Sequence, residues 1–311
     1  MFKRILTPLD GSTLSEGILP YVRALAPALG ARVELLHTHS SMTTYELEDL
    51  EGEEHASIMA ALEPVQTRLR NQSVSYLSQV AHGLADLGVE TRVSVRIGSP
   101  SDQIVDVAEQ EPDTLIAMST HGRAGVGRWL MGSVTDRVLH TTMTPMLVVH
   151  PERFSPSPDS ATAIQTLIVP LDGSDLAETV LPIAGAVAAA AGAGVHLVRV
   201  LDEAGRSAMS VGQLAEAGVS EGTREEGDAS EYLGGKAEDL RRGGVTEVHT
   251  MVVRGNPAEE IEELSRNTPN SMLVACTHGR SGVGRAVMGS VTDRLVRHSG
   301  HPTLVVRAPH Y

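Results

Sequence analysis

The chain has 311 residues, too many for one ordinary domain and enough for two of about 150 residues each. Its formal net charge of −14 argues against a nucleic-acid or anionic-membrane surface, because phosphate-rich partners need basic patches. A single cysteine, Cys276, excludes an intramolecular disulfide and a cysteine-rich zinc site. No stretch approaches the ~20 apolar residues of a membrane span, and the first residues lack a signal-peptide core, so we expect a cytoplasmic protein.

The sequence repeats itself once. Residues 4–12 return as residues 166–174, and residues 120–137 return as residues 277–294 with three differences. Between the repeats, residues 151–160 hold three prolines among polar side chains, a composition typical of linkers. We therefore predict two similar domains, residues 1–150 and 164–311, joined by a linker of residues 151–163.

Strand-like and helix-like patterns alternate from the start of the first half. The apolar run 5–7 predicts a buried strand, and the spacing of Thr13 and Glu16 predicts a capping box at a helix start. Apolar residues then recur three and four apart until Gly30, which is typical of a helix C-terminus. The segment 33–37 predicts a second strand.

A long polar helical segment, about residues 45–87, leads to a third strand at 89–97. Ser99-Pro100 predicts a helix N-cap followed by a first-turn proline, and a fourth strand follows at 114–118. A helix beginning at Ser133 and a strand at 146–149 complete the first half. The second half repeats this order, with strands at 167–169, 195–199, 245–253, 271–275 and 303–306 and helix starts at Asp175, Asn256-Pro257 and Ser290.

Alternating strands and helices with right-handed crossovers predict an α/β fold. We expect two tandem open sheets, each five-stranded and mostly parallel, with helices on both faces. Ligands of such sheets bind beyond the carboxyl ends of the strands, where the strand order reverses.

Glycine-rich segments follow the fourth strand of each half, at residues 119–134 and 276–291. Glycine lets backbone N–H groups approach an anion, and Ser133 or Ser290 can cap a helix whose dipole favours phosphate. These segments are neither a Walker A loop nor the dinucleotide fingerprint, because no Gly-Lys-Ser/Thr follows and because Asp-Gly-Ser follows the first strand. On these residues alone, a phosphate cradle and a tight strand-to-helix connector remain alternatives.

The element order, the Pro-x-Asp after the first strand and the late glycine loop resemble the universal stress protein family across nearly the whole chain, twice. ATP-binding members of that family share Gly, two residues, Gly, nine residues, then Gly-Ser or Gly-Thr. The last two glycine positions are matched by Gly122 with Gly132-Ser133 and by Gly279 with Gly289-Ser290. The first glycine is replaced by Ser119 in one half and by Cys276 in the other.

The resemblance implies the adenine-nucleotide alpha-hydrolase-like fold of this family and an ATP site in each half. It places the first-strand aspartate by the nucleoside, where Asp10 or Asp172 can accept from ribose hydroxyls or help hold Mg²⁺. It also implies that backbone after the second strand meets adenine, that a glycine after the third strand flanks the ribose and that the glycine loop holds the phosphates. In the first half these positions are Pro8, Asp10, Thr38, Gly98, Thr120, Gly122, Arg123, Gly125, Gly132, Ser133 and Val134; in the second they are Pro170, Asp172, Val200, Gly255, Thr277, Gly279, Arg280, Gly282, Gly289, Ser290 and Val291.

Family members pair through their last strand. The resemblance therefore implies that the two halves dock on each other as an internal pseudo-dimer, and that the chain self-associates through last-strand edges. The sequence identifies no protein partner.

Simpler roles remain open for several of these residues. Asp10 and Asp172 can merely start a turn, because Asp-Gly is a common turn signal. His121 and His278 have no evident nucleophile with a base partner, so we predict packing or turn roles for them and no catalytic residue. The segment around residues 45–87 is a solvated connector or a partner surface.

Three functions compete. The first is an ATP-binding regulatory module of the stress response with slow or no hydrolysis, favoured because the loop offers no carboxylate poised to orient water. The second is an ATPase or phosphotransferase, and the third is an interaction protein with empty sites. The sequence leaves ADP, AMP and cyclic AMP open as alternatives to ATP, and it leaves open whether both sites are filled.

Overall fold

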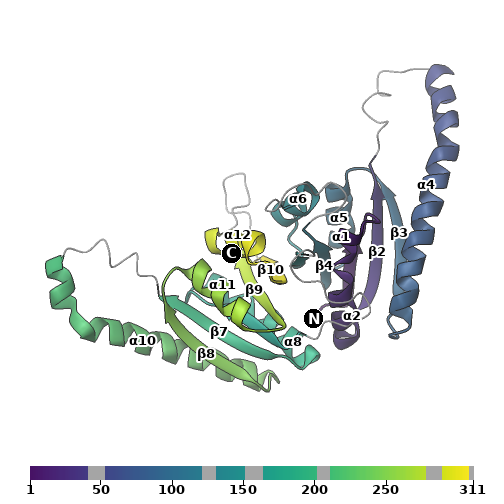
Figure 1. The fold of residues 1–311 in the computed structure, drawn as a ribbon. Helices are drawn as coiled ribbons and strands as arrows, with labels where there is room; N and C mark the ends of the chain where they lie inside the picture. Colours follow the sequence, from purple (N-terminus) through teal and green to yellow (C-terminus); the bar gives the residue numbers. More distant parts are fainter. Residues whose placement is uncertain (41–52, 121–130, 151–163, 202–210, 278–288, 308–311) are drawn as a thin grey trace.

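Strands and helices alternate in both halves of a computed structural model, which describes residues 1–40, 53–120, 131–150, 164–201, 211–277 and 289–307 (Figure 1). The first half contains β1 (Arg4–Pro8), α1 (Thr13–Glu16), α2 (Leu19–Leu29), β2 (Arg32–His39), α4 (Glu53–Ala85), β3 (Thr91–Ile97), α5 (Pro100–Glu109), β4 (Thr114–Ser119), α6 (Ser133–Thr141) and β5 (Met146–Val149). The second half contains β6 (Thr166–Pro170), α7 (Asp175–Glu178), α8 (Leu181–Ala191), β7 (Gly194–Leu201), α10 (Val211–Arg242), β8 (Val248–Arg254), α11 (Pro257–Asn267), β9 (Ser271–Thr277), α12 (Ser290–His298) and β10 (Thr303–Arg307).

All ten strands belong to one sheet, in the order β3-β2-β1-β4-β5-β10-β9-β6-β7-β8. The pairs within each half are parallel, which confirms the predicted open α/β architecture. The two five-stranded halves are joined edge to edge into one sheet, because β5 and β10 pair antiparallel. These last-strand edges thus satisfy each other within the chain, and the sheet ends instead at β3 and β8.

Helices cover both faces of the sheet. On one face a single hydrophobic core runs through both halves beneath α2, α4, α8 and α10. The other face carries separate clusters, one under α5 and α6 and one under α11 and α12. Successive side chains of a strand point to opposite faces, so Leu115 and Ala117 lie in one core and Ile116 lies in the other. Because both faces are buried, such a strand is a continuous apolar run in the sequence. Figure 1 shows α4 and α10 at opposite outer ends of the molecule.

The first helix of each half starts one residue earlier than the capping-box spacing predicts. Ser12 and Ser174 are the N-caps, and their hydroxyls accept from the N–H groups of Ser15 and Ala177. The helix then breaks near Gly17 and resumes as α2, whose end at Gly30 has the predicted left-handed conformation, φ 59°. The predicted long helix is confirmed as α4, although it begins at Glu53.

The helix after each glycine loop begins at the predicted residue, Ser133 or Ser290, but its N-cap differs from expectation. Gly132 and Gly289 are the N-caps of α6 and α12, and Ser133 and Ser290 are the first helical residues. The serines therefore do not cap these helices. Asn256 does cap α11, accepting from the N–H groups of the second and third helical residues, whereas Ser99 makes no side-chain cap bond to α5.

None of the described helices combines the length and apolar character that crossing a bilayer takes. The predicted linker, residues 151–163, lies outside the described residues, and the two domain limits stay a prediction.

Candidate functional site

The strand order reverses between β1 and β4 in the first half and between β6 and β9 in the second. β1 leads to β2 and β3 on one side, whereas β4 and β5 lie on the other side. The predicted residues Pro8, Asp10 and Thr120 follow or end strands at this reversal, and Pro170, Asp172 and Thr277 do so in the second half. Each half therefore has a crevice position at the carboxyl edge where α/β sheets take their ligands.

Asp10 organises the turn that follows β1. Its Oδ1 accepts from the Ser12 N–H at 2.9 Å and from the Ser12 hydroxyl at 2.6 Å. The same hydroxyl accepts from Ser15 N–H at 3.1 Å, so one hydrogen-bonded chain links the aspartate to the start of α1. The simpler turn role that the sequence left open is thus realised, with one carboxylate oxygen engaged in it.

Asp172 repeats this arrangement with one electrostatic difference. Its Oδ1 accepts from the Ser174 N–H at 2.9 Å and from the Ser174 hydroxyl at 2.6 Å. Burial of the carboxyl raises its pKa, but the bonds from Ser174 and the positive charge of Arg199 outweigh burial, so the pKa of Asp172 lies below its ordinary value. The sequence analysis missed Arg199 as a site residue.

Arg199 and His37 hold the same place in the two repeats. Nδ1 of His37 lies 2.8 Å from the Leu9 carbonyl oxygen, and Nη1 of Arg199 donates to the Leu171 carbonyl at 3.4 Å. A Cβ added to Gly173 would lie 3.1 Å from Arg199 Nη1, so the guanidinium lies against the Asp-Gly-Ser turn. The signal for this pair was available in the sequence, because aligning residues 33–39 with 195–201 sets His37 opposite Arg199.

Glu16 at the end of α1 adds a second carboxylate near the first site. The Tyr76 hydroxyl of α4 donates to Glu16 Oε1 at 2.8 Å. Burial and then the neighbouring Glu16 raise the pKa of Tyr76, so the hydroxyl keeps its proton and donates. In the second half Glu178 pairs instead with Lys236 of α10, at 2.5 Å.

The residues predicted to meet the base and the ribose lie on the outer strands. Thr38 of β2 pairs in register with Arg96 of β3, and Gly98 follows that strand with φ 141°, a conformation that favours glycine. Val200 and Gly255, φ 148°, occupy the same places in the second half. These positions share the carboxyl edge with Asp10 and Asp172 but lie on the far side of β1 and β6 from the glycine loops.

Thr120 and Gly132 bracket the first glycine loop. The Gly132 N–H donates to the Thr120 carbonyl at 2.6 Å, which closes the base of the loop. The Thr120 side chain is fully buried and its Oγ1 lies 3.2 Å from Nδ1 of His150. In the second half Thr277 is also buried, yet its Oγ1 has no hydrogen-bond partner among the described residues.

The two residues that replace the family's first glycine point toward the first helix of each half. Ser119 Oγ donates to the Ser15 carbonyl at 3.2 Å, and Cys276 Sγ lies 3.2 Å from Thr179 Oγ1. The backbone at each position accepts a bond from the helix after the loop, from Thr135 or Thr292 at 2.8 Å. Both side chains therefore fit on the side of the strand away from α6 and α12.

Six predicted loop residues lie outside the described residues, as do His121 and His278. They are Gly122, Arg123, Gly125, Gly279, Arg280 and Gly282. Gly132, Ser133 and Val134, and Gly289, Ser290 and Val291, lie where the loops join α6 and α12, as predicted.

A family model for the universal stress protein family matches residues 1–150 and 163–307. The chain belongs to the universal stress protein family. This membership confirms the resemblance that the strand-one turn and the late glycine loop indicate, and it covers both repeats.

Relatives within the universal stress protein family match one repeat or the whole chain. Universal stress protein MJ0577 of Methanocaldococcus jannaschii is 29% identical over 156 residues, which are 48% of this chain and 95% of that protein. Universal stress protein Slr1230 of Synechocystis is 23% identical over 318 residues, covering 98% of this chain and 100% of that protein. A crystal structure of a universal stress protein from Archaeoglobus fulgidus has a TM-score of 0.70, 20% identity and 98% coverage of both chains. At that identity the structural likeness shows the shared fold.

The carboxylates of this universal stress protein differ in how well they suit Mg²⁺. Mg²⁺ in nucleotide sites is held by one or two carboxylates together with phosphate oxygens and water. Oδ1 of Asp10 accepts from Ser12, and no described arginine hydrogen-bonds to the Asp10 turn as Arg199 does to the Leu171 carbonyl in the second half. Asp172 fits less well, because Arg199 already supplies positive charge there. No group of three or more His, Cys, Asp or Glu side chains that could hold a metal occurs among the described residues.

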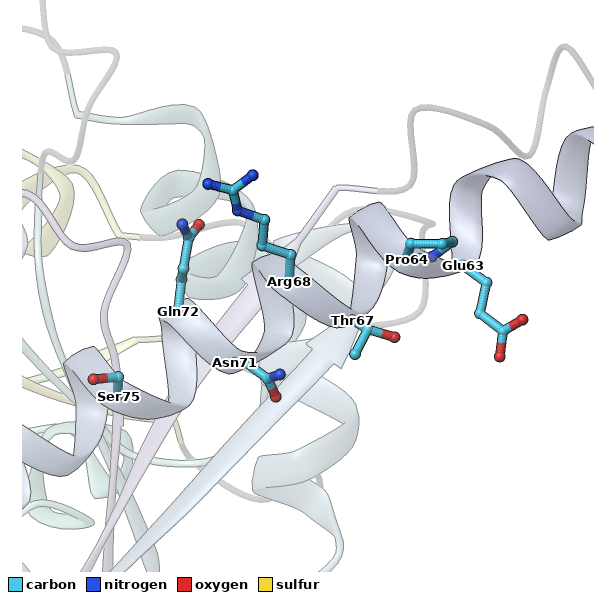
Figure 2. A pocket seen from close by; sticks show the side chains of 7 residues that line it. All are labelled: Glu63, Pro64, Thr67, Arg68, Asn71, Gln72 and Ser75. Atoms are coloured by element: carbon cyan, nitrogen blue, oxygen red, sulfur yellow. The ribbon is translucent and has the colours of Figure 1, made fainter.

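A hollow in the described surface lies elsewhere, along one side of α4. Figure 2 shows the seven side chains that line it projecting from this single helix. They are Glu63, Pro64, Thr67, Arg68, Asn71, Gln72 and Ser75. A hollow lined by one solvated helix has no opposing wall, so we assign the site to the sheet edge and not to α4.

Proposed function

We propose that each half of this universal stress protein binds one adenine nucleotide, ATP, at the reversal of strand order. The observation that carries the proposal is the arrangement at this edge. An Asp-Gly-Ser turn and the base of a glycine loop lie on adjacent strands, and a helix starts where the loop ends, in both halves. ATP-binding members of the family carry a glycine pattern whose last two glycine positions both loops share.

The phosphate end of the proposed site is the start of α6 or α12. Each helix has nine residues and begins directly after a glycine N-cap, so its first N–H groups have no intrahelical partner. Those groups and the helix dipole favour a phosphate. The Ser133 and Ser290 side chains are exposed at this point, where a hydroxyl can donate to a phosphate oxygen.

The nucleoside end is the turn after β1 or β6. Asp10 and Asp172 are held in place by their serine partners, and a carboxylate at this edge of the sheet can accept from ribose hydroxyls. Gly98 and Gly255 lie against the side chains of Gln103 and Glu260, at the outer side of the proposed site. We propose Asp10 as the better Mg²⁺ ligand of the two aspartates.

We propose that hydrolysis is slow or absent. Rapid hydrolysis would need a side chain that orients water in line with the terminal phosphate. The carboxylates of the first site described here are both engaged, Asp10 with Ser12 and Glu16 with the Tyr76 hydroxyl. A regulatory module of the stress response, whose shape or partner changes with nucleotide, therefore fits these residues better than an ATPase or a phosphotransferase does.

The test is to purify the protein, denature it by heat and chromatograph the supernatant. We expect ATP to copurify with the wild type and to be lost from a Gly132→Glu, Gly289→Glu double variant, whose added carboxylates repel phosphate. Recovery of ADP together with steady phosphate release above that of the double variant would support an ATPase instead. Absence of nucleotide, with no thermal shift on adding MgATP, would support an interaction protein with empty sites.

A further inference from the structure

Two side chains cross between the halves from equivalent places in the repeat. His150 follows β5 directly, and Arg307 is the last residue of β10. Nε2 of His150 lies 2.6 Å from the Val296 carbonyl oxygen in α12, and Nη2 of Arg307 donates to the Leu139 carbonyl in α6 at 2.6 Å. Each residue therefore contacts the helix that begins at the other half's glycine loop.

These contacts satisfy helix ends. Val296 and Leu139 lie in the last turns of nine-residue helices, where carbonyl groups have no intrahelical partner. A donor there bonds an orphan acceptor, and a cation also interacts favourably with the helix dipole. Thus His150 of the first half caps the C-terminal end of α12, and Arg307 of the second half caps that of α6. The N-terminal end of each of these helices faces the proposed phosphate site of its own half.

His150 makes a second contact, with Thr120. Because a carbonyl only accepts, Nε2 of a neutral His150 carries the proton, and Nδ1 accepts from the Thr120 hydroxyl at 3.2 Å. Thr120 closes the base of the first glycine loop, whereas the Thr277 hydroxyl beside the second loop has no described partner. One imidazole ring therefore joins the first loop to the helix of the second.

An ion pair ties the same two helices together. Arg297 of α12 donates to Asp136 of α6 at 2.6 Å and to Asp293 of its own helix at 2.7 Å. Burial lowers the pKa of Arg297, but the bonds to the two carboxylates raise it by more than burial lowers it, so the guanidinium stays charged. The equivalent residue in α6 is His140, whose Nδ1 lies 2.7 Å from the backbone carbonyl oxygen of Asp136 in its own helix.

We propose that His150 is a positioning residue that couples the two nucleotide sites. The inference rests on the proposed function and adds its regulation. A nucleotide phosphate at the start of α6 holds Gly132, whose N–H donates to the Thr120 carbonyl; Thr120 in turn contacts the ring of His150, and that ring contacts Val296 of α12. Because α12 begins at the second phosphate site, a nucleotide that stabilises this chain of contacts at one end also stabilises the helix at the other end, so binding at one site strengthens binding at the other.

A first experiment needs no nucleotide. In His150→Gln the amide nitrogen lies near the place of Nε2 and keeps the bond to Val296, whereas in His150→Asn it lies near Nδ1 and loses that bond. We expect backbone amides of residues 295–299 to exchange with deuterium about fivefold faster in His150→Asn than in the wild type, with His150→Gln close to the wild type. The matched control is His140→Gln, which should leave α12 exchange unchanged, because the described bond of His140 stays within α6. Equal exchange in all four proteins would overturn the proposal.

A second experiment measures the coupling itself. Calorimetric titration with ATP gives the intrinsic affinities from Gly132→Glu and Gly289→Glu, and the wild-type titration gives the product of both steps. We expect that product to exceed the product of intrinsic constants by about 5- to 150-fold, and the excess to fall to within about twofold of one in His150→Asn. Two bound nucleotides without any excess would overturn the coupling and leave the proposed function standing. No bound nucleotide would overturn both.

Discussion

Single residues distinguish the two sites that the repeat makes alike. Asp10 and Asp172 make the same bonds to the serine two residues on, but His37 stands by the first turn and Arg199 by the second. A fixed positive charge near Asp172 favours its ionised form and competes with a metal ion. We therefore expect the sites to differ in Mg²⁺ dependence, with the first half the more dependent one.

Asp172→Asn should make the free energy of unfolding less sensitive to acid. A carboxyl whose pKa is lowered on folding stabilises the folded state above its unfolded pKa, and this contribution is lost as pH falls through the folded pKa. Because Asp172 is exposed, we expect less than about 1 kcal/mol between wild type and variant at pH 7, shrinking below about pH 4. Urea unfolding from pH 7 to pH 2 checks this, and a difference that stays constant with pH would contradict it.

Thr277→Val and Thr120→Val should change stability in opposite directions. Valine removes the buried Thr277 hydroxyl that has no described partner, so we expect the free energy of unfolding to rise by about 1 kcal/mol. The same change at Thr120 removes its bond to His150 and should lower it by about 1 kcal/mol. Denaturant unfolding measures the free energy of unfolding of both variants, and each variant is the matched control for the other. Equal destabilisation in both would show that the hydroxyls are equivalent.

At the scale of elements, Arg4 holds the amino ends of three strands together. Its guanidinium is 2% exposed and contacts Thr114 of β4, Glu34 of β2 and the Val107 and Ala108 carbonyls of α5. The repeat places Thr166 at the equivalent position of β6, without such a network.

Arg4→Met should lower the free energy of unfolding by about 3–5 kcal/mol, because it leaves Glu34 and two carbonyls without their buried partner. Thr166→Val is the control, and we expect its effect to stay within about 0.5 kcal/mol. Thermal or urea unfolding of the two variants measures this, and similar stabilities for both would show that the Arg4 network contributes little.

Element order followed from the sequence, because apolar runs, Gly30 and Asn256 carry strong local signals. Helix starts were less predictable. Thr13 fits a capping box by spacing, but Ser12 caps because its hydroxyl is aligned by Asp10, a contact between residues that spacing does not reveal. Ser133 likewise is the first helical residue of α6 and not its N-cap, because Gly132 bonds back to Thr120 and takes the cap position.

Of the candidate site, the turn aspartates and the loop ends could be read from the repeat, because each follows a strand. The repeat aligns His37 with Arg199, but it does not show that they contact the turns. That contact depends on the register of β2 with β1 and of β7 with β6, which the sequence does not give. His150 escaped for the same reason, as its partner Val296 lies across the interface and far along the chain.

At the scale of the whole molecule, the antiparallel pair β5–β10 makes one sheet of two repeats. Its register sets Leu147 opposite Leu304, which are equivalent residues of the repeat, and sets Val148 opposite Thr303. Such a register is the one that a two-fold axis through two identical subunits would give. The sequence implied docking of the halves through the family resemblance, but a single ten-stranded sheet depends on which edges meet, and edges carry no local signature.

A fragment of residues 1–150 should form a dimer through β5. Removing β10 exposes a strand edge with Met146, Leu147 and Val148, and a second copy can pair there in the same antiparallel register. Light scattering with size-exclusion chromatography measures the mass, and Val148→Pro, which removes an N–H donor on the side of β5 that faces β10, serves as the control variant. A folded monomer at micromolar concentration would show that the pairing needs features particular to the second half.

Counting nucleotides bound per chain tests the central claim most directly. Native mass spectrometry of the protein with excess ATP should show two nucleotides on the wild type, one on Gly132→Glu or Gly289→Glu, and none on the double variant. Binding that is absent from the wild type, or that is unchanged by all three variants, would contradict the assignment of nucleotide sites to the loops at the sheet edge.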